Sequence, residues 1–361
     1  MAGALTQTTA AIISPTSVDQ EGNSYQNITN LVGTGPYVFD SRSFGERIEV
    51  TRFEEYWGEL PYYEQVVFLI VPEATTRESL LLAGQVDMII LPPASDIPAL
   101  DANPDVEVVF GPSNRTIFIV INTTKPGLDD ARVRQALNYA VDKQAIVDGI
   151  LFGAADVMDA PMAESLFGYE SIGTYEYDPE RAKALLAEAG IEPGELTLDF
   201  MAPTGRYVQD FPAAQAIANF LSEVGITANV RTMDWPTYVG TMVQPVDQNE
   251  TQLHLLGWAP AFMDASQQML QFQSSQHPPA GLATSFYENP ETDRLIAEAN
   301  STVDPEQRAE LYHEASRLIW EDAPWIFLWV QRFPMVHSAD VTNISGLPNE
   351  KFYALYAHPV D

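Results

Sequence analysis

The sequence predicts an α/β protein with mixed sheets, and three observations support this fold class. Short apolar runs alternate with helical patterns along the whole chain. Several of the helical stretches begin with a residue that commonly caps a helix. No internal repeat or low-complexity tract interrupts the alternation. Together these features favour layers of helices packed on sheets over an all-helical or all-strand fold.

The first element is the stretch GTGPYVF, residues 33–39. A glycine-rich phosphate loop needs consecutive backbone N–H groups and usually a lysine behind them. Here Pro36 removes one donor and no lysine follows. The alternating Ile48, Val50 and Phe53 instead indicate a hairpin. We therefore predict a turn that leads into a strand, and no phosphate site.

Five later apolar runs are typical of buried strands. They are VVFLIV (66–71), IFIVI (117–121), LTLDFM (196–201), LHLL (253–256) and WIFLWV (325–330).

Helices are predicted between these strands. Thr75 followed by Glu78 resembles a capping box and places a helix over 75–83. The stretch 129–150 puts apolar residues on one stripe and is predicted as one helix.

Helix ends carry signals of their own. Asp178-Pro179 and Asp304-Pro305 each combine a cap with a proline of the first turn, so a helix should begin at each. Gly190 and Gly225 stand where helices should stop.

Composition excludes several function classes. The 361 residues include 50 acidic and 18 basic ones, which gives a net charge of −32 and makes nucleic acid a poor partner. With 46% hydrophobic residues the chain is too apolar to be a disordered acidic polymer. An acidic surface that is poor in lysine, on an ordinary core, favours a halophilic source.

Signals for chemistry are sparse. The chain has no cysteine, which excludes disulfides, thiolate metal sites and a cysteine nucleophile. Its histidines are not spaced as metal ligands, and neither a G-x-S-x-G nor a G-x-G-x-x-G motif occurs. Residues 1–13 lack the pattern of a signal peptide, and no run is long enough to span a membrane. We therefore predict no metal, no cofactor and no catalytic residue.

Aromatic and basic residues near strand ends are the candidates for ligand binding. Trp258 follows a predicted strand directly, and Trp235 lies in the stretch MDWPTY. Each ring belongs either to the core or to a crevice where it stacks on a ligand. Arg206 and Tyr207 lie between a strand and a helix. The arginine there either pairs with Asp210 or meets an anionic or carbonyl group.

Four stretches in this order resemble the family 5 solute-binding proteins of ABC importers, which include dipeptide, oligopeptide and nickel binders. The stretches are GTGPYVF, FEEYWGELPYYEQVVFLIVPEATTRESLLLAGQVDM, DDARVRQALNYAVDKQAIVDGI and YDPERAKALLAEAGI. The resemblance covers the chain from about residue 13 to its end.

This resemblance implies a two-lobed periplasmic-binding-protein-like fold of type II, in its large family 5 variant, with the ligand held between the lobes. The first lobe would comprise residues 31–124 and 337–361, and the second residues 125–336. The crossings would fall near residues 122–126 and 332–338, with Asn122, Thr123 and Pro126 as hinge residues.

Family members are longer than this chain, so the resemblance further implies the C-terminal portion of such a protein. Residues 1–30 would be a remnant preceding an incomplete first lobe, and a signal sequence and lipid-bearing cysteine would lie upstream. An incomplete lobe should leave an unpaired strand edge and exposed apolar surface.

The implied function is that of the extracytoplasmic component of an importer, which binds a small molecule and docks on an ABC permease. We expect a monomer without enzymatic activity. Two alternatives remain open: a glycoside hydrolase that uses paired carboxylates, or a truncated remnant that no longer binds.

The ligand class also follows from the resemblance. In peptide-binding members, an aspartate three residues after the tryptophan that matches Trp258 pairs with the ligand's α-ammonium. Here Ala261 takes that place, while Asp264 follows one helical turn later as a possible substitute. Peptides and oligosaccharides therefore both remain candidate ligands, with Trp258 and Trp235 as stacking surfaces.

Overall fold

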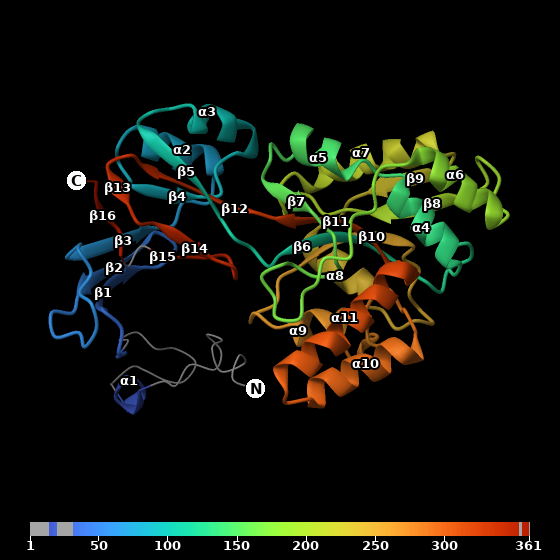
Figure 1. The fold of residues 1–361 in the computed structure, drawn as a ribbon. Coiled ribbons are helices and arrows are strands. Elements are labelled where there is room, and N and C mark those ends of the chain that lie inside the picture. The colour runs from blue at the N-terminus through green and yellow to red at the C-terminus, as the bar shows by residue number, and fades with distance from the viewer. Residues whose placement is uncertain (1–13, 20–31, 354–355, 361) are drawn as a thin grey trace. The chain divides into compact units, whose positions relative to one another are not determined.

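The structure is a computed structural model that describes residues 14–19, 32–353 and 356–360 (Figure 1). The chain forms two compact units. The first comprises residues 1–111 and 333–361, and the second comprises residues 112–332. The sequence placed the lobe boundaries at 124/125 and 336/337, whereas the compact units meet at 111/112 and 332/333. The lobe boundaries therefore stay a prediction.

The first unit begins with an antiparallel sheet in the order β1 (Tyr37–Ser43), β2 (Arg47–Arg52) and β3 (Gln65–Leu69). Bends at 34–36 lead into β1, and β1 pairs with β2 as a hairpin. The predicted turn and hairpin at GTGPYVF are therefore confirmed. A short helix, α1 (Pro15–Asp19), precedes this sheet in the chain.

The prediction that 66–71 is a buried strand was half wrong. The strand exists as β3, but Val67 and Leu69 are each 45% exposed. The reason is position: β3 lies at the edge of its sheet, and none of its residues belongs to a core cluster of the described structure. An apolar run alone cannot distinguish an edge strand from a central one.

A second three-stranded sheet in the first unit has the order β4 (Met88–Ile90), β12 (Phe333–Ser338) and β5 (Val106–Gly111). Its small apolar core involves α2 (Ala74–Leu82) and α3 (Ile97–Asp101), which follows the turn η3 (Ala94–Asp96). The core residues are Leu81, Ile89, Leu100, Val106 and Val336. Two short ribbons complete the unit: β13 (Val341–Thr342) with β16 (His358–Pro359), and β14 (Ser345–Leu347) with β15 (Lys351–Tyr353).

The predicted capping box in this unit was wrong. Helix α2 begins at Ala74 with Glu73 as its N-cap, and no side chain caps it. Because the helix starts one residue before Thr75, that threonine lies inside the first turn. Its hydroxyl is then not at the position from which it would accept the N–H of Glu78.

The second unit is built on a six-stranded mixed sheet in the order β7-β11-β6-β10-β8-β9. Strands β10, β8 and β9 run parallel, and the remaining pairs are antiparallel. This confirms the α/β fold class with mixed sheets. The strands are β6 (Thr116–Ile121), β7 (Ala155–Val157), β8 (Thr197–Met201), β9 (Thr227–Arg231), β10 (Leu253–Trp258) and β11 (Trp325–Gln331).

Helices cover both faces of this sheet (Figure 1). Ile117, Ile119 and Ile121 of β6 belong to one core cluster, whereas Phe118 and Val120 belong to the other. Successive side chains of a strand point to opposite faces, so a strand covered on both sides is apolar throughout. One cluster includes α4 (Ala131–Tyr139), α5 (Lys143–Gly149), α6 (Pro179–Glu188) and α7 (Asp210–Glu223). The other includes α8 (Trp235–Met242), α9 (Ala265–Met269), α10 (Pro290–Ser301) and α11 (Pro305–Asp322), with the turns η4 (Leu270–Phe272) and η5 (Ser274–Gln276) beside them.

The single helix predicted over 129–150 is in fact two helices, α4 and α5. They separate because the Asp142 carboxylate accepts the backbone N–H of Ala145 at 2.9 Å and caps a new helix. Both helix starts predicted at Asp-Pro pairs are confirmed, with Asp178 and Asp304 as N-caps. Gly190 and Gly225 follow helix ends with φ of 80° and 85°, as predicted.

Candidate functional site

The candidate site lies at one edge of the six-stranded sheet in the second unit. Strands β8, β9 and β10 are parallel, so their carboxyl ends share this edge. The segments that follow them carry Arg206 and Tyr207, Trp235, and Trp258 at the end of β10. The chain also enters the unit before β6 and leaves it after β11 at the same edge, because β6 is antiparallel to both β10 and β11. Ligands of open α/β sheets typically bind at such carboxyl ends.

Three predicted residues come together there. The Arg206 guanidinium lies 5.1 Å from the ring centroids of both Tyr207 and Trp235. The two rings meet edge to face at 6.3 Å, and Trp235 stacks on Tyr238 at 5.4 Å. Arg206 is exposed and Trp235 is half-buried, so the cluster presents a cation backed by aromatic faces.

The loop that carries Arg206 is organised by Asp210. Its carboxylate accepts the backbone N–H groups of Gly205, Arg206 and Tyr207 at 2.8–3.0 Å. The Asp210 side chain is thereby occupied with the loop backbone, and the guanidinium lies over the aromatic rings instead. The expected pairing of Arg206 with Asp210 is therefore not seen, and contact of the guanidinium with an anionic or carbonyl group stays a prediction.

A close approach joins this loop to β10. The Tyr207 hydroxyl donates to the carbonyl oxygen of Gly257 at 3.3 Å, and burial raises the pKa of that hydroxyl. A Cβ atom added at Gly257 would lie 2.7 Å from Tyr207 Cε1 and 2.6 Å from Ile117 Cδ1. Only glycine therefore fits at this point of the strand.

Trp258 is half-buried and packs against the core cluster on the α8–α11 side of the sheet. Its carbonyl oxygen accepts the Thr116 hydroxyl at 3.3 Å. Its indole Nε1 is buried and has no hydrogen-bond partner among the described residues. Trp258 is therefore partly a core residue, with one unused donor.

Two buried amides that the sequence did not single out lie near Thr116. Asn114 donates to the carbonyl of Pro260 at 2.5 Å, and Gln268 donates to the carbonyl of Pro161 at 3.1 Å. Both side chains are fully buried, yet Asn114 Oδ1 and Gln268 Oε1 lack partners within the described structure. Buried acceptors without partners are rare, but both oxygens are closed to solvent, so a ligand does not reach them in this structure. Nothing in the local pattern marked them, since isolated amides are common in loops and helices.

Ala261 and Asp264 lie beyond the end of β10. Ala261 is exposed, and its N–H donates to Gln267 Oε1. Asp264 is the N-cap of α9 and forms a bidentate ion pair with Arg308, at 2.7 Å for both oxygens. Burial alone would raise the pKa of Asp264, but hydrogen bonds from Arg308 and Ser266 outweigh it and lower the pKa. This carboxylate already has a cationic partner.

The residues predicted as a hinge lie at the opposite edge of the same sheet. Asn122 is fully buried and donates to the carbonyl of Thr251 at 2.8 Å. The Thr123 hydroxyl donates to the carbonyls of Ser285 and Phe286, and the residue lines a cavity of about 380 Å³. Pro126 is exposed in a turn. These hydrogen bonds all stay within the second unit, and the hinge role remains a prediction.

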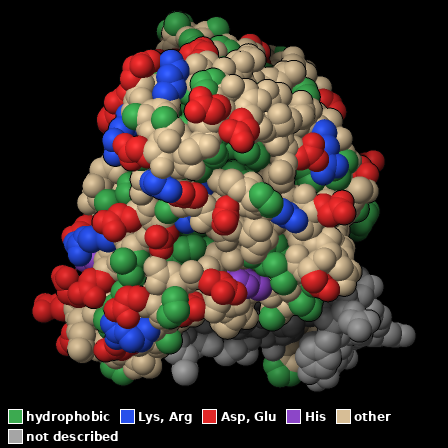
Figure 2. Space-filling view, turned by 90° about the vertical axis from the view of Figure 1, so that its right-hand side faces the viewer, with side chains coloured by type: hydrophobic (Ala, Val, Ile, Leu, Met, Phe, Trp, Pro, Cys, Tyr) green, Lys and Arg blue, Asp and Glu red, His purple; other side chains and the backbone are tan. Residues whose placement is uncertain are grey.

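Neither a metal cluster nor a membrane-spanning helix is found in the described parts of the chain. The surface in Figure 2 shows many acidic side chains with fewer basic ones among them, in keeping with the net charge of −32.

Comparison with known protein families shows to which family the chain belongs. Residues 2–279 match the family described as bacterial extracellular solute-binding proteins, family 5 Middle. The chain belongs to family 5 of the bacterial extracellular solute-binding proteins. This confirms the family expected from the quoted motifs.

Individual relatives of this family 5 protein are similar over most of its length. Heme-binding protein A of Haemophilus influenzae is 32% identical over 89% of this chain and 57% of the relative. Glutathione-binding protein GsiB of Salmonella choleraesuis is 30% identical over 95% of this chain and 67% of the relative. The first relative is thus matched over little more than half of its length.

A solved relative is similar in fold. The dipeptide-binding protein of Pseudoalteromonas sp. SM9913, determined in complex with Met-Leu, superposes with a TM-score of 0.71 and is 25% identical. The superposition covers 91% of this chain and 65% of that protein. The expected periplasmic-binding-protein fold of family 5 is confirmed.

Proposed function

We propose that this family 5 protein is the solute-binding component of an ABC importer, acts outside the cytoplasm and delivers its ligand to a membrane permease. Family membership supports this proposal. Relatives are named for binding heme and glutathione, and a solved relative holds a dipeptide. Capture and release need no covalent chemistry, so the protein acts without turnover. The glycoside hydrolase alternative gains no support from these relatives.

The main support for a ligand site is the cluster of Arg206, Tyr207 and Trp235 at the carboxyl edge of the second unit's sheet. An exposed guanidinium over two rings suits a ligand with a carboxylate or carbonyl beside an apolar or sugar face. A peptide- or oligosaccharide-like ligand can use the guanidinium and the aromatic faces.

The charge state of the ligand follows from the acidic residues after β10. Ala261 offers no carboxylate, and the Asp264 carboxylate is held by Arg308 through two hydrogen bonds. A ligand ammonium buried here would lack a counter-charge, at a cost of several kcal/mol. We therefore propose that the ligand is neutral or blocked at its amino end, such as an acylated peptide or an oligosaccharide.

Calorimetric titration tests both proposals. The whole chain is titrated with di- to pentapeptides, with the same peptides acetylated at the amino end, and with short oligosaccharides. Saturable binding of acetylated peptides or oligosaccharides, without turnover, is expected. Arg206→Ala should weaken this binding, whereas Arg294→Ala should not, because Arg294 pairs with Glu291 and Glu298 on helix α10.

The other outcomes are equally informative. Binding of an unblocked peptide that is lost on Asp264→Asn but unaffected by Trp258→Ala would overturn the ligand class. Hydrolysis of a chromogenic glycoside would favour an enzyme. Absence of any saturable binding would favour a remnant that has lost the activity.

A further inference from the structure

Six asparagines of the sequence stand in the pattern Asn-X-Ser/Thr, the acceptor pattern for N-linked glycans. An acceptor in a folded protein needs an exposed side chain and a side-chain nitrogen, Nδ2, that is not already donating a hydrogen bond, because the sugar is attached to that nitrogen. One of the six, Asn27, lies outside the described residues. The structure separates the other five by these two requirements: Asn114, Asn122, Asn249, Asn300 and Asn343.

Three of the five are excluded by burial. Asn114 and Asn122 are 0% exposed, and Asn249 is 2% exposed. Each of them also donates from Nδ2 to a backbone carbonyl oxygen, at 2.5, 2.8 and 2.9 Å respectively. A glycan cannot be attached to these nitrogens while the second unit is folded.

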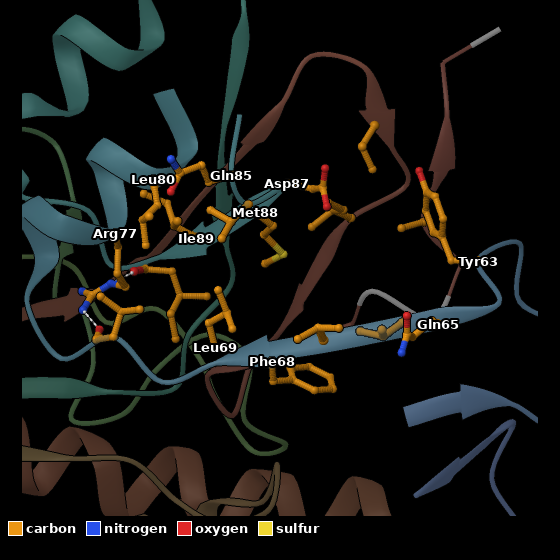
Figure 3. Close-up of a pocket in the computed structure, with 18 residues that line it drawn as sticks. Tyr63, Gln65, Phe68, Leu69, Arg77, Leu80, Gln85, Asp87, Met88 and Ile89 are labelled. Atoms are coloured by element: carbon orange, nitrogen blue, oxygen red, sulfur yellow. Dashed lines mark hydrogen bonds between the residues drawn. The ribbon is translucent and has the colours of Figure 1, made fainter. Parts of the chain in front are cut away.

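Asn343 is exposed, but its nitrogen is occupied. It lies between β13 and β14 with φ of 60°, and its Nδ2 donates to the carbonyl oxygen of Tyr356 at 2.9 Å. Val341 and Ile344, on either side, line a cavity of about 510 Å³ in the first unit (Figure 3). The hydroxyl residue of this pattern, Ser345, is part of β14. The segment is therefore held in place around a nitrogen that already has a partner.

Asn300 meets both requirements. It is exposed and is the penultimate residue of α10. Its Oδ1 accepts the hydroxyl of Tyr312, on α11, at 2.8 Å, whereas its Nδ2 donates no hydrogen bond within the described structure. The oxygen of the carboxamide is thus turned toward the neighbouring helix, and the nitrogen is left without a partner.

The Tyr312 hydroxyl determines this orientation of the carboxamide. The hydroxyl accepts a hydrogen bond from Arg308 Nη2 at 2.9 Å, so its own single proton is left for Asn300. Burial is the main reason that the pKa of Tyr312 is raised to about 12, so the hydroxyl keeps that proton at neutral pH. A donor that faces Asn300 needs an acceptor, and the acceptor atom of a carboxamide is the oxygen.

The chain around Asn300 is open to an enzyme. Helix α10 ends at Ser301, Thr302 is extended with φ of −80° and ψ of 130°, and Val303 is 96% exposed in the turn between α10 and α11 (Figure 1). Helix ends fray readily, so the last turn of α10 can open without disturbing the core. Thr302 supplies the hydroxyl of the acceptor pattern.

We propose that Asn300 is the acceptor of an N-linked glycan, which is attached after the second unit has folded. The donor is a lipid-linked oligosaccharide. Nδ2 forms a bond to C1 of the first sugar and gives up one proton to a base of the transferring enzyme. The bond between C1 and the lipid phosphate oxygen breaks, and the phosphate leaves with the electron pair. The proposal rests on the extracytoplasmic location proposed above, since this acceptor pattern is used in exported proteins.

The test uses the folded whole chain with Asn27→Gln, which removes the one acceptor pattern outside the described residues. The chain is incubated with an oligosaccharyltransferase that recognises Asn-X-Ser/Thr and with its lipid-linked oligosaccharide. Intact mass spectrometry should show one added glycan, and fragmentation of the peptides should place it on Asn300. A free peptide of residues 296–304 is the control for the enzyme and should also be modified.

A matched pair of variants separates the acceptor pattern from local structure. The hydroxyls of Ser301 and Thr302 both donate to the carbonyl oxygen of Glu298, at 2.9 and 2.8 Å. Ser301→Ala and Thr302→Ala therefore remove equivalent hydrogen bonds, but only Thr302 belongs to the acceptor pattern. We expect Thr302→Ala to lose the glycan and Ser301→Ala to retain it. Circular dichroism of both variants checks that the fold is unchanged.

Four results would overturn the proposal. The folded chain stays unmodified at Asn300 while the free peptide is modified; or the peptide itself is not accepted; or the glycan is found on Asn343 or on a buried asparagine instead; or Thr302→Ala is modified as well as Ser301→Ala. The calorimetric titration of ligands uses the unmodified chain. A failure of glycan transfer therefore leaves the ligand-binding result intact, and a failure to bind ligand leaves the mass spectra intact.

Discussion

The two units treat similar apolar strands in opposite ways. In the second unit, Phe118 on β6 is fully buried because helices cover both faces of the sheet. In the first unit, Leu69 on β3 is 45% exposed, although its strand is just as apolar. Local sequence is therefore a poor guide to burial, and what decides it is whether other elements pack on the strand.

This difference has an energetic side. Burial of apolar surface stabilises a fold by roughly 25 cal/mol per Å². The second unit has two extensive core clusters, whereas the core cluster among the described residues of the first unit consists of five buried residues. The second unit should therefore be the more stable of the two and should not depend on the first for its fold.

The largest expected effect follows directly. Residues 112–332 form one continuous stretch, and when produced alone they should fold cooperatively with an intact near-ultraviolet circular dichroism spectrum. In urea, the whole chain should lose the structure of the first unit before that of the second. A single transition with an m-value typical of the full length would show instead that the units unfold together.

One substitution in each unit measures how much a buried and an exposed strand residue contribute to stability. Phe118→Ala should destabilise the second unit by about 3–5 kcal/mol, because it leaves a cavity beside Trp325, whose ring stacks on Phe118 at 3.4 Å. Leu69→Ala should change the stability of the first unit by less than about 0.5 kcal/mol. Chemical denaturation of both variants gives the comparison, and equal losses would contradict it.

A fall in pH should lower the stability of the second unit specifically. His254 on β10 is fully buried, its Nε2 lies 2.9 Å from the Thr284 hydroxyl, and burial lowers its pKa to about 3. Between pH 6.5 and 3 the His254 imidazole binds a proton in the unfolded chain but stays neutral in the folded unit. Stability should therefore fall by about 1.4 kcal/mol per pH unit across this window and level off below it.

His254→Gln removes that titration while an amide can still bond to Thr284. The stability of the variant should depend less on pH between 6.5 and 3 than that of the parent chain. Denaturation midpoints at half-unit pH steps would show this, and parallel curves for the two proteins would refute the assignment.

Added salt should change the melting temperature of both units, and this is the smallest of the expected effects. The net charge of −32 produces self-repulsion, which is screened as the Debye length falls from about 10 Å at 0.1 M to about 3 Å at 1 M salt. The melting temperature should therefore rise with KCl by a few degrees. A flat response would remove the reason to expect a halophilic source.

Much of the second unit could be predicted from sequence. The strands β6, β8, β10 and β11 and the Asp-Pro helix starts have short-range causes, and they lie where the pattern placed them, whereas β7 and β9 were not predicted. The break between α4 and α5 was missed because Asp142 acts as a cap only once the chain bends there. The exposure of β3 was missed because it depends on what packs on the strand, which no local pattern encodes.

The candidate site was predictable only in part. Arg206, Tyr207 and Trp235 were chosen from their places near strand ends, and the structure brings them together. The buried, unpaired oxygens of Asn114 and Gln268 could not be predicted, because their burial and lack of partners arise only after folding. The pairing of Asp264 with Arg308, 44 residues away, was equally invisible along the chain.

The close approach at Gly257 has a consequence for how this sequence can change over generations. The Tyr207 ring occupies the space that any side chain at position 257 would need, since a Cβ atom there would lie 2.7 Å from Tyr207 Cε1. Substitutions at the two positions are therefore linked. A larger residue at 257 requires a smaller one at 207, and a smaller residue at 207 introduced first leaves a cavity beside Gly257. Among descendants of this chain, the two positions should covary, and alterations of the ring beside Arg206 should be accompanied by compensating alterations in β10.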